Sequence, residues 1–312
     1  MKNNKILVVL IVALFSLVAK AQQDPQYTQY MYNMSVINPA YATDNPDIVN
    51  LGGIYRAQWM SIEGAPRTAS FFVHTPLSRK VEMGLSVVHD EIGNIVNENN
   101  AYVDFAYVLS LSETSRLSFG LKAGATFYDT DFSNFVLTDD MPDTAFSENI
   151  SRIFPNVGAG VFYFSDKYYL GLSVPNLLKS HHIENQDGIS YQSVEDYHFF
   201  FTGGYVFNLN DNLKFKPAFM AKTVFDAPMS LDVTANFLFN NRVEMGAAYR
   251  WDDAVSGLIN FRLSPSLRIG YAYDHTLSNL GRFNSGSHEI MVLFDINKLG
   301  KNNGFDISPR FF

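Results

Sequence analysis

The sequence contains no cysteine among its 312 residues. This absence excludes a disulfide framework and any metal site built from thiolates. Charged residues are also scarce, at 17% of the chain, and acids outnumber bases to give a formal net charge of −8. An acidic chain of this kind is a poor ligand for polyanions, so we expect no nucleic acid partner.

Long apolar runs are lacking except at the N-terminus. Two lysines precede an apolar run from Ile6 to Val18, and the small residues of Ala19-Lys20-Ala21 follow it. This order is that of a secretory signal peptide, and the run is too short for a spanning helix. We expect residues 1–21 to be removed and the chain to be exported. No later run approaches the roughly eighteen apolar residues that a spanning helix needs.

Strict alternation of apolar with polar or small residues dominates the region between Leu213 and Asp274. From Leu231 to Phe239, for example, apolar residues hold one parity while Asp232, Thr234 and Asn236 hold the other. Successive side chains of a strand point to opposite faces, so a period of two predicts antiparallel β-structure. Each segment has about ten residues, the length that a tilted strand needs to cross a bilayer.

About fourteen strand segments follow one another without a linker or a change of composition. They are residues 49–60, 68–74, 81–89, 101–110, 116–128, 156–164, 168–174, 197–207, 213–225, 229–239, 243–251, 255–263, 267–274 and 288–296. The expected fold is all-β: one transmembrane antiparallel up-and-down β-barrel over residues 49–296, with a periplasmic C-terminal tail at residues 297–312. The 27 phenylalanines and 17 tyrosines suit such a barrel.

The connections between these segments differ in length from one rim to the other. Minimal polar turns occupy residues 78–80, 112–114, 165–167, 210–212, 240–242 and 264–266, whereas longer loops include residues 90–100, 129–155, 175–196 and 275–287. Short periplasmic turns and long extracellular loops are typical of outer-membrane barrels. We therefore expect an outer-membrane location, with apolar side chains facing lipid. An even number of strands places both termini on the short-turn side.

The polar parity of each strand would then face the lumen. Its expected charged residues are Glu82, Asp104, Lys122, Lys214, Lys216, Lys222, Asp232, Glu244, Arg250, Arg262, Arg268 and Asp274. Both signs are interleaved with glycine, a mixture that favours a crowded, self-paired interior over a selective ion pore.

Residues 22–48 break the β pattern with three prolines. Tyr27, Tyr30, Met31 and Met34 recur at three- and four-residue spacing, which suits a short amphipathic helix. The segment either plugs or lines the barrel or forms a poorly ordered N-terminal arm, and composition leaves both alternatives open.

Catalytic motifs are not evident in the sequence. No set of nucleophile, base and orienting acid appears, and no glycine-rich phosphate loop. His181-His182, and likewise Asp139-Asp140 with Asp143, fit solvated loops better than metal sites. We expect no enzymatic activity, no metal and no cofactor.

A dense motif follows the leader. Asp24-Pro25 precedes Tyr27-Thr28-Gln29-Tyr30-Met31, and Asn38-Pro39-Ala40-Tyr41-Ala42 comes next. Tyr55-Arg56-Ala57-Gln58-Trp59 and Gly64-Ala65-Pro66-Arg67-Thr68 follow. These residues resemble the PorP/SprF family of outer-membrane proteins of the type IX secretion system and gliding motility. The motif positions that carry over are Tyr30, Asn38, Pro39, Arg56, Gln58, Trp59, Gly64, Pro66 and Thr68. Parity in the first strand predicts Arg56 and Gln58 in the lumen and Trp59 outward at a rim.

The resemblance implies a non-enzymatic component that supports secretion and surface attachment of an adhesin or motility protein. Its implied partners are the C-terminal domain of a secreted type IX substrate, other type IX components at the periplasmic face, and outer-membrane lipid. Aromatic residues of the long loops are candidates for binding the secreted protein: Phe132, Phe135, Phe146, Phe154 and Tyr191. The alternative is a transport barrel for small or hydrophobic solutes with an N-terminal hatch.

Overall fold

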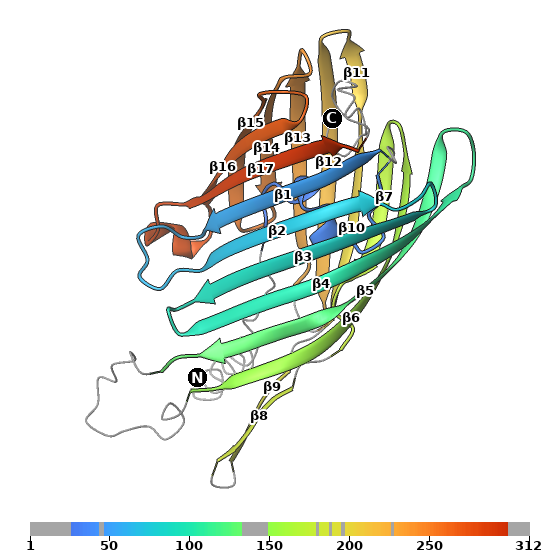
Figure 1. Ribbon diagram of the computed structural model, residues 1–312. Coiled ribbons are helices and arrows are strands. Elements are labelled where there is room, and N and C mark those ends of the chain that lie inside the picture. Colours follow the sequence, from blue (N-terminus) through green and yellow to red (C-terminus); the bar gives the residue numbers. More distant parts are fainter. Residues whose placement is uncertain are drawn as a thin grey trace, which may run out of the picture.

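The computed structural model describes residues 26–43, 47–132, 149–178, 181–186, 189–194, 197–225 and 228–298. The expected signal peptide and most of the expected C-terminal tail lie outside these ranges. In the described part of the chain, one antiparallel sheet curls round and closes on itself as a barrel (Figure 1). Among the described residues, no helix is long and apolar enough to cross a membrane.

Fourteen strands of the described chain close the barrel. They are β1 (Ile48–Ala57), β2 (Arg67–Pro76), β3 (Val81–Ile92), β4 (Val96–Ser110), β5 (Ser115–Thr130), β6 (Ser151–Ser165), β7 (Tyr168–Val174), β10 (His198–Tyr205), β12 (Leu213–Val224), β13 (Ser230–Phe239), β14 (Val243–Arg250), β15 (Ala254–Arg262), β16 (Leu267–Thr276) and β17 (Ser287–Asn297). Neighbours in the chain pair in order, and β1 pairs with β17 to close the ring. The expected barrel of about 14 strands is confirmed.

Three short strands accompany the ring. β11 (Phe207–Asn210) continues from β10 and pairs with the first residues of β12. β8 (His181–Gln186) and β9 (Ile189–Val194) form a separate hairpin between β7 and β10, which projects from the barrel in Figure 1. The expected loop at residues 175–196 therefore contains β-structure of its own.

The two rims of the barrel differ as expected. One rim, the turn side, carries the short connections after β2, β4, β6, β11, β13 and β15, together with the start of β1 and the end of β17. The opposite rim, the loop side, carries the connections after β1, β3, β5, β7, β12, β14 and β16.

Two expected loops are shorter than the sequence indicates. The prediction of a loop over residues 90–100 is wrong, because β3 and β4 remain paired as far as Ile92 and Val96. Only a three-residue turn is left between them, with positive φ at Gly93 and Asn94. The loop at residues 129–155 is likewise too long, because β5 continues to Thr130 and β6 begins at Ser151. These strand ends keep backbone pairing but lose the hydropathic alternation, so the sequence pattern ends before the strand does.

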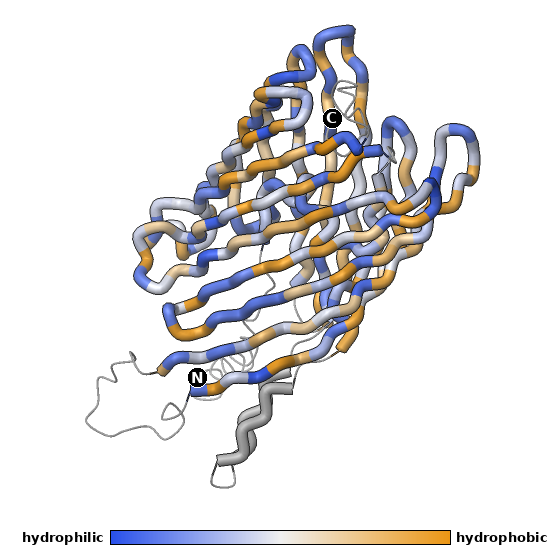
Figure 2. The backbone as a smooth tube through the Cα atoms, in the orientation of Figure 1, coloured by the Kyte–Doolittle hydropathy of each residue, from blue (hydrophilic) through white to orange (hydrophobic). Residues whose placement is uncertain are grey.

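Hydrophilic and hydrophobic residues alternate along the barrel strands, as the colours of the backbone tube show (Figure 2). Of the twelve charged residues expected in the lumen, Lys214 is half-buried and the other eleven are buried. The opposite parity exposes large apolar side chains, for example Val233 at 46% and Met245 at 50%. This inside-out distribution suits a barrel surrounded by lipid.

Residues 26–43, which we call the plug, lie inside the barrel. Every residue from Tyr27 to Thr43 is buried except the half-buried Val36. The spacing from Tyr27 to Met34 predicts a short amphipathic helix, and the plug instead contains one 3-10 turn, η1 (Tyr30–Tyr32), followed by one helical turn, α2 (Met34–Ile37). Backbone N–H groups of the plug donate hydrogen bonds to side chains of the barrel wall. Its apolar residues join the main buried cluster with Phe72, Phe162 and Tyr169.

A charge on the outward face should cost more at mid-strand than near a rim. Ala235 lies midway along β13 on the parity of the exposed Val233, and Phe239 ends the strand on the turn side. Ala235→Arg should lower the free energy of unfolding in lipid vesicles by about 2–4 kcal/mol, and Phe239→Arg by about 0–1 kcal/mol. Urea titration followed by the gel mobility of unheated samples measures both. Equal costs would contradict the membrane placement of β13.

Candidate functional site: the plug and its seat

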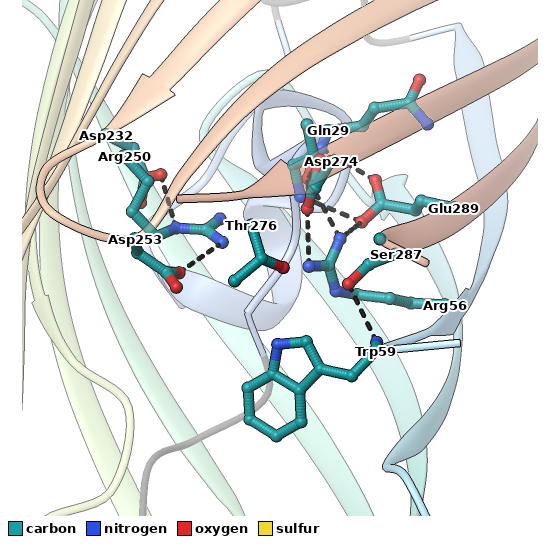
Figure 3. A network of polar contacts seen from close by, with 12 residues as sticks. Gln29, Arg56, Trp59, Asp232, Arg250, Asp253, Asp274, Thr276, Ser287 and Glu289 are labelled. Carbon is teal, nitrogen blue, oxygen red and sulfur yellow. Dashed lines mark hydrogen bonds and ion pairs between the residues drawn. The ribbon is translucent and has the colours of Figure 1, made fainter. Parts of the chain in front are cut away.

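The loop-side anchor of the plug centres on Arg56, which is 2% exposed near the end of β1. Its guanidinium places Nη2 at 2.6 Å from Asp274 Oδ2 and Nη1 at 3.2 Å from Glu289 Oε2. Nη1 also donates to Thr28 Oγ1 at 3.0 Å. Figure 3 shows Arg56 between the two carboxylates, which come from β16 and β17. Removing one partner from a buried ion pair of this kind costs about 3–5 kcal/mol.

The plug supplies the remaining donors to these carboxylates. The backbone N–H groups of Thr28 and Gln29 donate to Glu289 at 2.9 and 2.8 Å, and the Thr28 hydroxyl donates to Asp274 at 2.7 Å. Charge-assisted hydrogen bonds are roughly twice as strong as neutral ones. The plug is therefore part of the ion-pair network, because it satisfies oxygens that Arg56 alone does not.

The turn-side anchor holds the other end of the plug. The backbone N–H of Thr43 donates to both carboxylate oxygens of Glu82, at 2.9 and 2.7 Å. His74 Nε2 lies 2.6 Å from the same carboxylate, so β2, β3 and the plug meet at one buried group.

Between the anchors, the Asn38-Pro39-Ala40 turn rests directly on the wall. Asn38 Nδ2 donates to the backbone oxygen of Val161 at 3.1 Å, and Asn38 Oδ1 accepts from Ala40 N at 2.9 Å. Glycines on β5 and β6 make this approach possible. A Cβ at Gly120 would lie 2.2 Å from Ala40 N, and one at Gly160 would lie 2.2 Å from Asn38 Oδ1.

Two further contacts fix the plug backbone at this point. The Ser173 hydroxyl on β7 donates to Ile37 O at 2.9 Å, and Lys122 Nζ on β5 donates to Val36 O at 3.1 Å. These wall donors satisfy the last carbonyls of the short helix α2, which has no continuation to satisfy them.

Tyr32 contacts the charged half of the wall. Its hydroxyl donates to Glu244, while Lys216 Nζ and Arg268 Cζ lie 5.6 and 4.9 Å from its ring centroid. A phenol is protonated at physiological pH, so Tyr32 is the donor and the Glu244 carboxylate is the acceptor.

The expected motif positions mostly serve the plug and the adjoining loop-side connections. Tyr30, Asn38 and Pro39 are buried in the plug, and Arg56 faces the lumen as expected. Gly64 has φ of 72° and accepts a hydrogen bond from Gly93 N at 2.9 Å, which joins the β1–β2 and β3–β4 connections.

The remaining motif residues lie around the same connection. Gln58 N donates to Pro66 O at 3.0 Å to close the loop, and the Thr68 hydroxyl donates to Asp90 on β3. Strand parity places neither Gln58 in the lumen nor Trp59 outward, because β1 ends at Ala57. Trp59 has φ of 44°, is half-buried and donates from its backbone to Ser287 Oγ at 3.1 Å (Figure 3).

The candidate partner-binding aromatics are not brought together in the described residues. Phe135 and Phe146 lie outside those residues, as does the side chain of Tyr191 in β9. Phe132 is half-buried beyond the end of β5, where its N–H donates to Asn149 Oδ1 at 2.9 Å. Phe154 was expected in a loop but lies in β6, on the lumen-facing parity of the buried Asn156.

The sequence analysis did not identify two groups of lumen-facing residues that hold the plug: Glu289 and the glycines at 120 and 160. Glu289 shares the inward parity of β17 with Met291 and Leu293, opposite exposed residues such as Ile290 and Val292, so alternation was sufficient to find it. The glycines at 120 and 160 also hold inward parity, but nothing in the sequence showed what approaches them.

A cavity of about 80 Å³ lies against the plug. Its lining includes Tyr27, Tyr102, Lys122, Phe200, Lys222 and Asp232. Among the residues described, no cluster of three or more His, Asp or Glu side chains suits a metal ion. The lumen-facing side chains described above instead hold a polypeptide segment, the plug, inside the barrel.

One protein family is similar to this chain over most of its length. The family model for the type IX secretion system membrane protein PorP/SprF matches residues 19–294. No curated protein matches the chain. Among solved structures, the P. putida toluene transporter TodX is 11% identical, with a TM-score of 0.47 and coverage of 83% of this chain and 92% of that one. The Acinetobacter baumannii outer membrane protein Omp33 is 9% identical, with a TM-score of 0.45 and coverage of 81% and 100%.

Adding one methyl group beneath the plug should unseat it. Gly120→Ala places a Cβ against the plug backbone, whereas Gly257→Ala on β15 meets nothing within 4 Å and is the matched control. We expect Gly120→Ala to destabilise the protein by about 1–3 kcal/mol through overpacking. A buried cysteine introduced as Ser35→Cys should then react faster with maleimide than in the Gly257→Ala background. Equal reaction rates would show that the glycine does not seat the plug.

Proposed function

The chain belongs to the PorP/SprF family of type IX secretion system membrane proteins, and from this premise we propose that it supports secretion and holds a secreted protein at the cell surface. It is an outer-membrane β-barrel. The partner in this proposal is the C-terminal domain of a type IX substrate, an adhesin or motility protein. Other type IX components would meet the barrel at the turn side, which faces the periplasm in this orientation.

The observation that carries the proposal is the occupied lumen. The plug is anchored at the loop side by Arg56, Asp274 and Glu289 and at the turn side by Glu82. A barrel filled by its own chain is better suited to a rigid scaffold than to an open conduit. Binding residues concentrate on loops held by such a scaffold.

The loop side offers the surface for attachment. The connections after β5 and β7 are the long ones, and the second carries the β8–β9 hairpin. Exposed apolar residues also occur on the shorter connections, for example Leu277 at 51% and Phe283 at 72%. Apolar anchors among polar residues are the usual composition of protein-binding surfaces.

We propose that the protein is not an enzyme. The buried ionisable groups of the lumen bond to one another and to the plug backbone, as Arg56, Glu82 and Glu289 do. Their hydrogen-bonding capacity is thus directed to holding the chain.

The cavity next to the plug favours the second candidate, transport of small or hydrophobic solutes. Its apolar lining of Tyr102, Phe200 and Met220 suits such a solute. The attachment function and the transport function predict different conductances for the purified protein. We expect purified protein in planar bilayers to show no large steady conductance, because the plug fills the lumen. A large, steady conductance of the unaltered protein would favour transport.

Shortening one loop tests attachment. Residues 133–148 would be replaced by a short Gly-Ser linker, so that Phe132 and Asn149 keep their hydrogen bond. The barrel should assemble, and a specific secreted protein should move from the cell surface to the medium while other export continues. The same linker inserted at Glu113, in a turn-side connection, should release nothing. If the shortened protein retains every surface protein, this loop is not the attachment site.

A further inference from the structure

Four neighbouring connections on the loop side are joined to one another by backbone hydrogen bonds. Leu277 N donates to Asp253 O at 2.7 Å, which joins the β16–β17 connection to the β14–β15 connection. Met60 N donates to Gly286 O at 2.8 Å and joins the β1–β2 connection to the β16–β17 connection. A further bond at 2.9 Å joins the β1–β2 connection to the β3–β4 connection. We call this surface the rim platform, and it comprises residues 58–66, 93–95, 251–253 and 277–286.

The two central connections of the rim platform, β1–β2 and β16–β17, lie side by side and have a fixed shape (Figure 1). Ser285 N donates to Met60 O at 2.8 Å, and the hydroxyl oxygens of Ser61 and Ser285 lie 2.8 Å apart. Within the β16–β17 connection, Asn284 Nδ2 donates to Leu280 O at 2.7 Å. Ser61 has a positive φ of 78°, a conformation that a non-glycine residue keeps where surrounding contacts enforce it.

The rim platform stands on the loop-side anchor of the plug. Arg56 is the penultimate residue of β1, and Glu289 is the third residue of β17. Their buried ion pair joins the two strand ends that carry the β1–β2 and β16–β17 connections. The hydrogen bond from Trp59 N to Ser287 Oγ at 3.1 Å fastens these connections next to that ion pair. The contacts that seat the plug thus also hold the rim platform in one shape before any partner binds.

Large apolar side chains are exposed on this fixed surface. Met60 belongs to the β1–β2 connection, and Leu277 and Phe283 belong to the β16–β17 connection. All three lie beyond the ends of the paired strands, and not on the strand parity that faces lipid. An exposed apolar side chain on a rigid backbone is a good interface anchor, because little conformational freedom is lost when a partner covers it.

The charged residues of the rim platform are three acids and one base: Glu63, Asp252, Asp253 and Arg282. Glu63 and Asp252 are exposed, whereas Asp253 is half-buried beside Arg250. Complementary charge across an interface steers association and suppresses wrong partners. A partner that fits this surface therefore carries basic side chains, and an anionic lipid head group would be repelled.

We propose that the rim platform is the docking surface for a folded extracellular domain of an exported protein, whose contact face combines apolar residues with basic ones. The loop side faces outward in the orientation of outer-membrane barrels, so such a domain can reach the rim platform. This docking rests on the proposed attachment function, for which it supplies the surface and the partner chemistry. The main contact lies over the seam between β1 and β17.

Release of the partner from the cell surface tests the docking surface. Cells that lack this chain first identify the partner, as the surface protein that moves to the medium. Phe283→Asp should lower the surface amount of that same protein about tenfold or more, because an apolar anchor is replaced by a charge. Leu111→Asp, at an exposed site on a turn-side connection, is the matched control and should retain the partner. The gel mobility of unheated samples verifies that both barrels assemble.

Full retention of the partner by Phe283→Asp overturns the docking surface and leaves the attachment function intact. If cells that lack the chain release no surface protein, the attachment function and the docking surface both fail. If Phe283→Asp does not assemble, Phe283 is replaced by the photoreactive p-benzoylphenylalanine. This residue should cross-link to the released protein on illuminated cells, and the absence of that cross-link refutes the docking surface.

Charge reversal tests the chemistry of the partner. Glu63→Lys and Asp252→Lys should each lower the surface amount of the partner, whereas Arg282→Glu should not lower it. All three side chains are exposed, so the barrel should assemble in each variant. A loss with Arg282→Glu, or full retention with both lysine variants, refutes a basic contact face.

Discussion

The buried charge of Arg56 is the constraint on which the rest of the structure depends. A guanidinium withdrawn from water is stable only when carboxylates face it and when their other oxygens find donors. Arg56 on β1 is the direct cross-strand neighbour of Glu289 on β17, so this ion pair lies across the seam that closes the barrel. The second donors to Glu289 are plug N–H groups. Closure of the barrel and seating of the plug therefore stabilise each other.

The barrel wall contacts the plug through two different kinds of surface. On β5 and β6, glycines at 120 and 160 let the plug backbone come into direct contact, and Phe162 packs among its apolar residues. On β12, β14 and β16, long charged side chains such as Lys216 and Arg268 reach inward to the ring of Tyr32. Small residues on one wall and long ones on the other let an irregular segment fill a regular barrel.

Much of the barrel could be predicted from the sequence, because a lipid-facing parity and a lumen-facing parity leave a period of two. The period of two is lost where strands extend beyond the apolar layer. Residues Asn97 to Asn100 pair with β3, but their sequence predicts a loop. The plug gave no comparable signal. Its conformation comes from bonds to distant residues such as Glu82 and Glu289, and neither spacing nor propensity within residues 26–43 encodes those partners. Strand parity also gives no position for Trp59, because β1 ends at Ala57.

The location of the motif residues bears on where partner specificity resides. Arg56 and Asn38 are engaged by the plug and the wall, and Gly64 joins two connections through its backbone. A side chain committed to internal hydrogen bonds cannot also read an external surface without breaking them. These motif residues thus account for how the plug is held. Under the proposed attachment function, recognition would fall to side chains of the loop-side connections, such as the exposed Leu277 and Phe283.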